Sequence, residues 1–173
     1  MRNSKKHLIA KRIAEELMDG DVVHLSTGLP QLVADYVVDK KVKIILQSLM
    51  SCGGHIDFAV LEALEVDEKG NLAIDIASSI GSGLDLITRA NKVLIAMTHS
   101  SKDGTPKILR ECRLPLTAVG QVELIVTNLG VIEVTPNGLL LKEMASGVGL
   151  EDILSQTEAD LFISDELKTA AFI

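Results

Sequence analysis

The spacing of hydrophobic and polar residues predicts alternating helices and strands along the whole chain. Apolar positions recur at helical spacing from about Lys5 to Met18, and Asp19-Gly20 ends this helix because glycine readily adopts the left-handed C-terminal conformation. Runs of aliphatic and β-branched residues predict the main strands, at Val22 to Leu25, Val42 to Leu46, Lys92 to Met97 and Val122 to Thr127. Further helices are predicted at Pro30 to Val38, Ser79 to Ala90 and Leu150 to Thr157.

Turn signals predict two hairpins and the remaining strands. The turn Asp67 to Asn71 joins a candidate strand, Asp57 to Leu64, to Leu72 to Ile76. The second hairpin joins Val131 to Val134 with Leu139 to Glu143, and the last strand is Leu161 to Ile163. Because a helix that leads straight into a buried strand is typical of parallel sheets, we expect an α/β fold with a mainly parallel sheet.

Composition agrees with one α/β domain that spans residues 1–173. Hydrophobic residues make up 47% of the chain and aromatic residues only 2%, so aliphatic side chains must fill the core. The formal net charge is -7, which disfavours nucleic acid as a partner. The only basic cluster is predicted to be the solvated face of the first helix; its members are Arg2, Lys5, Lys6, Lys11 and Arg12.

Other features of the sequence exclude several classes of protein. No stretch approaches the ~18 apolar residues of a membrane span and no secretion signal is present, so a cytoplasmic location is expected. Cys52 and Cys112 have no spacing typical of a metal site and are predicted to be free thiols. The four histidines lie far apart in the sequence and each is predicted to be structural or exposed.

Three small-residue turns are the candidate ligand-binding features: Ser26-Thr27-Gly28, Gly53-Gly54 and Gly81-Ser82-Gly83. Glycine allows a ligand to approach the backbone, and a turn that leads to a helix presents free N–H groups, so these turns could line a site for a phosphate-bearing ligand. The alternative is that each glycine serves only the backbone conformation of its turn. No dinucleotide fingerprint or phosphate-loop signature is present, which disfavours bound NAD or ATP.

Several segments resemble the B subunit of family I CoA-transferases, in the same order and over nearly the whole chain. They include Gly28-Leu29-Pro30, Gly53-Gly54-His55-Ile56-Asp57, Val66 to Ala73, and Lys107-Ile108-Leu109 through Leu114 to Ala118. The resemblance implies a three-layer fold, with a mainly parallel sheet between helices, and an obligate A subunit as partner. It also implies acyl-CoA and small carboxylates as substrates, CoA held in part by the glycine turns, and no tightly bound cofactor.

The resemblance breaks where the catalytic residue of that family is expected. The family's nucleophile is a glutamate within Ser-Glu-Asn-Gly, and a carboxylate suits this role because its acylated form is a good leaving group. Here Leu46-Gln47-Ser48 matches the start of the motif, but Leu49-Met50-Ser51-Cys52 follows. Relative to the family, segments are therefore missing after about residue 48 and after about residue 73. No catalytic residue is assigned, since Glu62 and Glu65 are predicted to face solvent and Glu143 lies in a late hairpin.

Two main hypotheses for the function follow. The chain is either a subunit of an acyl-CoA:carboxylate CoA-transferase or a catalytically dead, B-like scaffold that keeps the fold and the subunit interface. The sequence leaves open whether the missing segments reflect an inactive paralogue, an excision, or loops left out of this sequence. A sugar-phosphate isomerase of the same fold is a third possibility, but no acid/base motif supports it. In either main case we expect association, with an A subunit or with a second copy.

Overall fold

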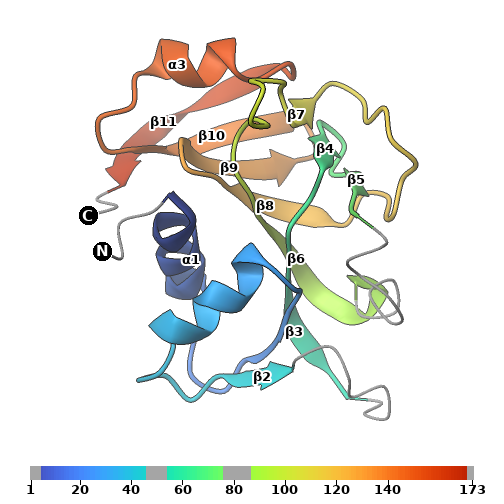
Figure 1. Cartoon of the computed structure of the whole chain (residues 1–173), viewed down its shortest axis with the longest axis vertical. Coiled ribbons are helices and arrows are strands. Elements are labelled where there is room, and N and C mark those ends of the chain that lie inside the picture. The colour runs from blue at the N-terminus through green and yellow to red at the C-terminus, as the bar shows by residue number, and fades with distance from the viewer. Residues whose placement is uncertain (1–4, 46–53, 76–86, 171–173) are drawn as a thin grey trace.

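The computed structural model describes residues 5–45, 54–75 and 87–170, and its central feature is an eight-stranded sheet (Figure 1). The strand order is β11-β10-β9-β8-β6-β3-β1-β2. The bounds are β1 Val22–Leu25, β2 Lys43–Ile45, β3 Ile56–Leu61, β6 Ala90–Ala96, β8 Val122–Val126, β9 Gly130–Thr135, β10 Gly138–Ala145 and β11 Leu161–Ala170.

Most neighbouring strands run parallel. Strands β2, β1, β3, β6 and β8 form one continuous parallel run, β9 and β10 are antiparallel to their neighbours in a hairpin, and β11 is parallel to β10. Strand β6 lies between β3 and β8, and its apolar residues from Val93 to Ala96 are buried. The predictions of a mainly parallel sheet, and of a buried central strand at Lys92 to Met97, are therefore confirmed.

The sheet is the middle of three layers. One face packs against α1, Lys5–Glu16, and the helix η1, Leu29–Tyr36, through the buried side chains of Ile9, Ile13, Leu17, Val33, Leu94 and Val126. The other face is covered by α3, Leu150–Ser155, and by a small sheet in the order β5-β4-β7. The bounds of this small sheet are β4 Glu65–Asp67, β5 Leu72–Ala73 and β7 Ile108–Leu109. Figure 1 shows α1 and η1 on one side of the main sheet and the small sheet beyond β6.

Several predicted elements differ in type or length from those observed. Residues 29–36 form a 3-10 helix, and the strand predicted from Asp57 ends at Leu61. The last strand continues to Ala170, because β10 supplies hydrogen-bonding partners as far as Ala145 beyond an irregularity between Leu141 and Glu143. Most of the helix predicted from Ser79 lies outside the described residues, and Ala90 already belongs to β6. The predicted hairpin between β9 and β10 is confirmed. The turn at Asp67 to Asn71 also forms a hairpin, but its first strand is β4 and not the strand predicted from Asp57, which belongs to the main sheet as β3.

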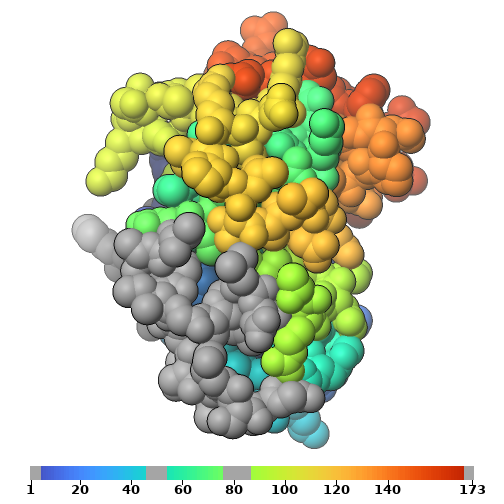
Figure 2. Space-filling view, turned by 90° about the vertical axis from the view of Figure 1, so that its right-hand side faces the viewer, coloured from blue at the N-terminus to red at the C-terminus, as the bar shows by residue number. Residues whose placement is uncertain are grey.

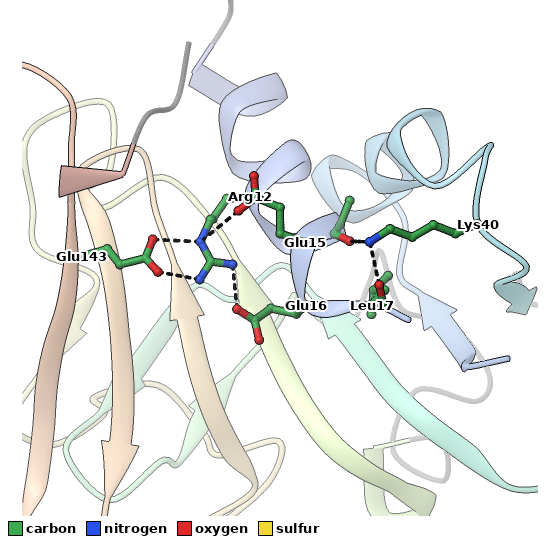
Figure 3. A network of polar contacts seen from close by, with 7 residues as sticks. Arg12, Glu15, Glu16, Leu17, Lys40 and Glu143 are labelled. Carbon is green, nitrogen blue, oxygen red and sulfur yellow. Dashed lines mark hydrogen bonds and ion pairs between the residues drawn. The ribbon is translucent and has the colours of Figure 1, made fainter. Parts of the chain in front are cut away.

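The prediction that the whole basic cluster is solvated is wrong at Arg12, which is only 8% exposed. Its Nε and Nη2 atoms donate to the two carboxylate oxygens of Glu143 on β10, at 2.9 and 2.7 Å, and Nη1 donates to Glu16 at 2.6 Å. These hydrogen bonds raise the pKa of Arg12 and lower the pKa of Glu143. Figure 3 shows that the guanidinium lies between α1 and β10, so Arg12 ties the helix to the distant half of the sheet.

The C-terminal end of α1 is fixed by a second cation. Lys40 Nζ donates to the carbonyl oxygens of Ala14 and Leu17 at 2.7 and 2.6 Å (Figure 3). A positive group at this end of a helix satisfies free carbonyls and complements the helix dipole. The helical layer is therefore held by the Arg12 ion pairs and by the Lys40 hydrogen bonds to carbonyls, as well as by its apolar face.

Candidate functional site

The carboxyl ends of the parallel strands meet at one edge of the main sheet. Residues 26–28 follow β1, residues 62–64 follow β3, residues 97–100 follow β6 and residues 127–129 follow β8. In open α/β sheets, ligands bind outside this edge, because the loops there converge while the strands hold them rigidly. This edge is therefore the candidate site.

The turn after β1 is built into the sheet by hydrogen bonds to β3. The Ser26 N–H donates to the carbonyl of Val60 at 3.0 Å, and the Ser26 hydroxyl accepts from the Glu62 N–H at 3.4 Å. Gly28 has a φ of +91°, which glycine adopts without strain, and the chain then enters η1 with Pro30 near its start. The segment is a strand, a tight turn and a helix, as the sequence predicted.

Glu62 occupies the space beneath this turn. Its Oε2 atom accepts a hydrogen bond from the Leu29 N–H at 3.1 Å, and a Cβ atom added to Gly28 would lie 2.7 Å from the same oxygen. An anion that used the Leu29 N–H would have to displace this carboxylate. The prediction that Glu62 and Glu65 face solvent is wrong, since both are half-buried and Glu65 accepts from the N–H groups of Arg113 and Leu114.

The predicted ligand-binding glycines do not all lie at this edge. Ser26, Thr27 and Gly28 lie together at the carboxyl end of β1, whereas Gly54 precedes β3 and so lies at the opposite, amino-terminal edge. The carbonyl of Gly54 accepts from the Arg89 guanidinium at 2.8 Å. Three further predicted residues, Gly53, Gly81 and Gly83, lie outside the described residues, as does Cys52.

Lys107 brings a buried positive charge to the same region. It lies just before β7 and its carbonyl accepts from the Val66 N–H at 2.9 Å, yet the residue is only 8% exposed. Burial lowers the pKa of its ammonium group, and the negative charge of Glu62 partly opposes this effect. Within the described part of the chain, no hydrogen bond or ion pair joins its Nζ atom to an acceptor.

His99 joins the loop after β6 to two other elements. Its ring nitrogens form hydrogen bonds with the hydroxyl groups of Thr127 at 2.9 Å and Thr157 at 2.8 Å. Its backbone N–H donates to the side-chain oxygen of Asn128 at 2.9 Å. The side chain is fully buried, and this burial lowers its pKa to about 4. His99 is therefore a neutral, structural residue at neutral pH, which agrees with the prediction made for it.

Glu62 and Lys107 are the residues of this edge that the sequence did not assign to it. The apolar alternation around Glu62 suggested a longer strand with an outward carboxylate, although its position directly after a strand was a usable signal. Lys107 had a weaker signal, since it stands between Pro106 and the apolar pair Ile108-Leu109. Among the residues that the structure describes, no group of three or more His, Cys, Asp or Glu side chains could hold a metal ion. No helix within the described ranges is long and apolar enough to cross a membrane.

Comparisons with known proteins identify the family. The family model for coenzyme A transferase matches residues 47–156, which is more than half of the chain. The chain therefore belongs to the coenzyme A transferase family. Within that family it belongs to the beta, or B, subunits of the family I enzymes, as two relatives show.

The chain is similar to the beta subunit of acetate CoA-transferase from Haemophilus influenzae, at 38% identity over 210 residues that cover 94% of each chain. It is also similar to the B subunit of succinyl-CoA:3-ketoacid coenzyme A transferase from Helicobacter pylori, at 32% identity over 90% of this chain and 97% of that protein.

Solved structures confirm the fold. The acyl-CoA transferase YdiF of Escherichia coli O157:H7 matches with a TM-score of 0.81 and 22% identity, over 98% of this chain but only 44% of that chain. The chain thus spans less than half of YdiF. Glutaconate coenzyme A-transferase of Acidaminococcus fermentans matches with a TM-score of 0.73 and 18% identity, over 98% of this chain and 90% of that one.

Proposed function

We propose that this chain is the B-type subunit of a two-subunit acyl-CoA:carboxylate CoA-transferase and that, in its 173-residue form, it does not catalyse the transfer. The observation that carries this proposal is the position of β2. Strand β2 pairs in parallel with β1, with His24 opposite Ile45, so the chain leaves β2 at the same edge as the Gly28 turn. The resemblance to Ser-Glu-Asn-Gly breaks at Ser48, three residues beyond the end of β2.

The length of the comparison with a relative supports the proposal that internal residues are missing from this chain. The comparison with the Haemophilus influenzae protein runs over 210 residues, which is more than the 173 residues of this chain. The relative therefore has residues that this chain lacks between segments that do match. We place these gaps after about residue 48 and after about residue 73, where the family resemblance is interrupted.

The described carboxylates near this edge are poor replacements for the nucleophile. The family reaction forms an anhydride and then a glutamyl-CoA thioester, so the attacking carboxylate needs a free oxygen directed at the bound thioester. Glu62 and Glu65 instead accept hydrogen bonds from backbone N–H groups, which hold them against the protein. The segments that build the sheet and helices thus match the family, whereas the glutamate nucleophile is absent from this chain.

The substrates we propose are an acyl-CoA and a short carboxylate or oxoacid, with CoA bound as substrate and no tightly held cofactor. A solved structure of YdiF is described as a thioester complex with CoA, which supports CoA as the substrate class of this fold. We propose that Ser26, Thr27 and Gly28 contribute to the CoA site, together with Gly53, Gly54, Gly81 and Gly83. Because Gly54 lies at the opposite edge from Gly28, the first turn has the stronger structural support.

We propose an A-type subunit as the partner, in a cytoplasmic complex, with self-association as the alternative. The relatives are named as beta and B subunits, which supports a second type of subunit. The segment after β7 also carries exposed aliphatic side chains, at Leu114, Leu116 and Val119, and exposed Leu64 lines the same hollow as Leu114. Such groups are often covered by another chain in an assembly.

A reconstitution assay tests the proposal. The purified chain is mixed with an A-type subunit, acetoacetyl-CoA and acetate, and transfer is expected to be undetectable. A second form carries the relative's segment after Ser48, beginning with Glu-Asn-Gly, and is expected to be active; changing the inserted glutamate to glutamine should abolish activity again. If the restored form folds and binds its A-type partner yet stays inactive, the chain is a scaffold and not an interrupted enzyme subunit.

A further inference from the structure

A hollow of about 570 Å³ lies beside the carboxyl edge of the sheet, between the loop after β6 and the segments next to β4 and β7. Figure 2 shows this loop in yellow-green at the upper left, next to the gold segment that follows β7. The residues that line it and matter here are Leu64, Glu65, Thr98, Ser101, Lys107 and Leu114. All of them belong to the described part of the chain.

Lys107 is the unusual member of this lining. The residue is only 8% exposed, and its ammonium group takes part in none of the ion pairs between described residues. Every fully buried side-chain polar atom in the described residues has a hydrogen-bond partner, so the unpaired Nζ atom of Lys107 must still reach open space. Glu62 is close enough for its charge to act on Lys107, but that carboxylate already bonds the Leu29 N–H. Lys107 therefore presents an unused donor to the hollow that it lines, where a mostly buried ammonium group gains from an anion.

The anionic groups in the wall of the hollow are already engaged elsewhere. Glu65 accepts from the N–H groups of Arg113 and Leu114, at 2.7 and 2.9 Å, and Asp103 accepts from the Thr105 N–H at 3.1 Å. Glu65 is thereby held to the segment after β7, and Asp103 to its own loop. The positive charge of Lys107 thus remains without a close partner in the wall.

The rest of the wall is partly apolar. Leu64 and Leu114 are 44% and 42% exposed, so each offers an aliphatic surface to a neighbouring group. A ligand that gained from both features would carry one negative charge and a short hydrocarbon chain. A doubly charged phosphate fits less well, because Lys102, the other cation of the lining, is exposed and screened by water, whereas the half-buried carboxylates of Glu62 and Glu65 would repel the second charge.

We propose that this hollow binds a short-chain carboxylate, with its carboxylate group on the Lys107 ammonium and its hydrocarbon chain against Leu64 and Leu114. Identifying this ligand with the acid substrate or product of the transferase rests on the proposed function. The binding itself does not, because it needs neither the missing glutamate nor an A-type subunit.

The test is a titration of the ¹⁵N-labelled, full 173-residue chain, followed by two-dimensional amide NMR at constant ionic strength. Acetate, butyrate and inorganic phosphate are the probes. Butyrate is expected to shift the amides of Thr98, Lys107 and Leu114 in a saturable way, more tightly than acetate, and phosphate should not saturate. Lys107→Met should weaken butyrate binding at least about tenfold, whereas Lys69→Met removes an exposed charge elsewhere and should leave it unchanged.

Three results would overturn the proposal: no saturable shift in the unmodified chain, butyrate binding within about twofold of normal in a folded Lys107→Met variant, or phosphate binding as tightly as butyrate. The amide spectrum itself shows whether each variant is folded. A further variant, Leu114→Ala, should weaken butyrate binding more than acetate binding, and equal effects would contradict the proposed orientation. Transfer activity is not measured, so a negative reconstitution assay and a negative titration remain separate results.

Discussion

Arg12 and Lys107 are equally buried, at 8% exposure, but their surroundings are opposite. Arg12 lies between α1 and β10 and donates to both oxygens of Glu143 as well as to Glu16, so its pKa is raised. Lys107 lies near the carboxyl edge of the sheet with no close acceptor among the described residues, and burial lowers its pKa. Arg12 therefore stabilises the framework, whereas Lys107 lines a hollow and has no close acceptor.

This difference between Arg12 and Lys107 reflects a difference between the helical layer and the carboxyl edge of the sheet. In the helical layer, Arg12 is paired with carboxylates, Lys40 is hydrogen-bonded to carbonyls and the apolar faces are packed, as a stable framework requires. At the carboxyl edge the structure keeps the Glu62 carboxylate under a turn and the Lys107 ammonium group without a described acceptor. Buried groups that lower stability, and that form no stabilising contact in exchange, are more common at functional sites than elsewhere.

The largest expected effect is that of Arg12→Met. The substitution leaves Glu143 partly buried without its cation, and we expect a loss of about 3 kcal/mol in the free energy of unfolding, measured by urea denaturation at pH 7. Because Arg12 lowers the pKa of Glu143, the stability contributed by this pair is present above the ordinary glutamate pKa and is lost as pH falls through the lowered value. The difference between the two proteins should therefore shrink in acid, and a constant difference would contradict this explanation.

His99 tests an intermediate case, a buried basic group whose partners are neutral hydroxyls. Its folded pKa of about 4 is below the ordinary value of 6.5, so the unfolded chain takes up a proton first and stability falls as pH drops from about 6.5 to 4. Between pH 7 and pH 5 this group alone should cost about 2 kcal/mol. His99→Gln should have a flatter stability profile over this range, with the residual slope due partly to His24, whose pKa burial also lowers. An unchanged slope would show that His99 does not control it.

The smallest expected effect is that of Lys107→Met. Removing a mostly buried ammonium group that lacks an acceptor should be neutral or stabilising, by up to about 1 kcal/mol at pH 7. Because the folded pKa of Lys107 is lowered, any gain should diminish as pH rises toward the ordinary lysine pKa. Unfolding curves at pH 7 and pH 10 measure this. A marked loss of stability would mean that Lys107 has a structural partner, and the contrast with Arg12 would fail.

The main strands were predictable because they are short apolar runs whose burial does not depend on distant detail. Strand β1 was predicted with its observed bounds, and β6 and β8 to within two residues at each end. The second helix was predicted in place but is a 3-10 helix. Strand β11 was predicted too short, since its second half is polar and is ordered by pairing with β10 and not by an apolar pattern of its own.

The site was less predictable, because its side chains meet through contacts between segments far apart in the sequence. The turn at Ser26-Thr27-Gly28 could be found from composition, but the carboxylate of Glu62 beneath it required the pairing of β1 with β3. Likewise, Arg12 was assigned to a solvated helix face, since nothing local to it indicates that Glu143 lies 131 residues away in sequence and within hydrogen-bonding distance.

We propose that this chain has the framework of a CoA-transferase B subunit and lacks a group able to carry the covalent intermediate. The most direct test is intact-mass spectrometry of the chain after incubation with an A-type subunit and acetoacetyl-CoA. We expect no covalent CoA adduct on the 173-residue chain, and an adduct on the inserted glutamate when the segment beginning with Glu-Asn-Gly is restored after Ser48. A CoA thioester on the 173-residue chain, mapped by proteolysis to Glu62 or Glu65, would contradict it.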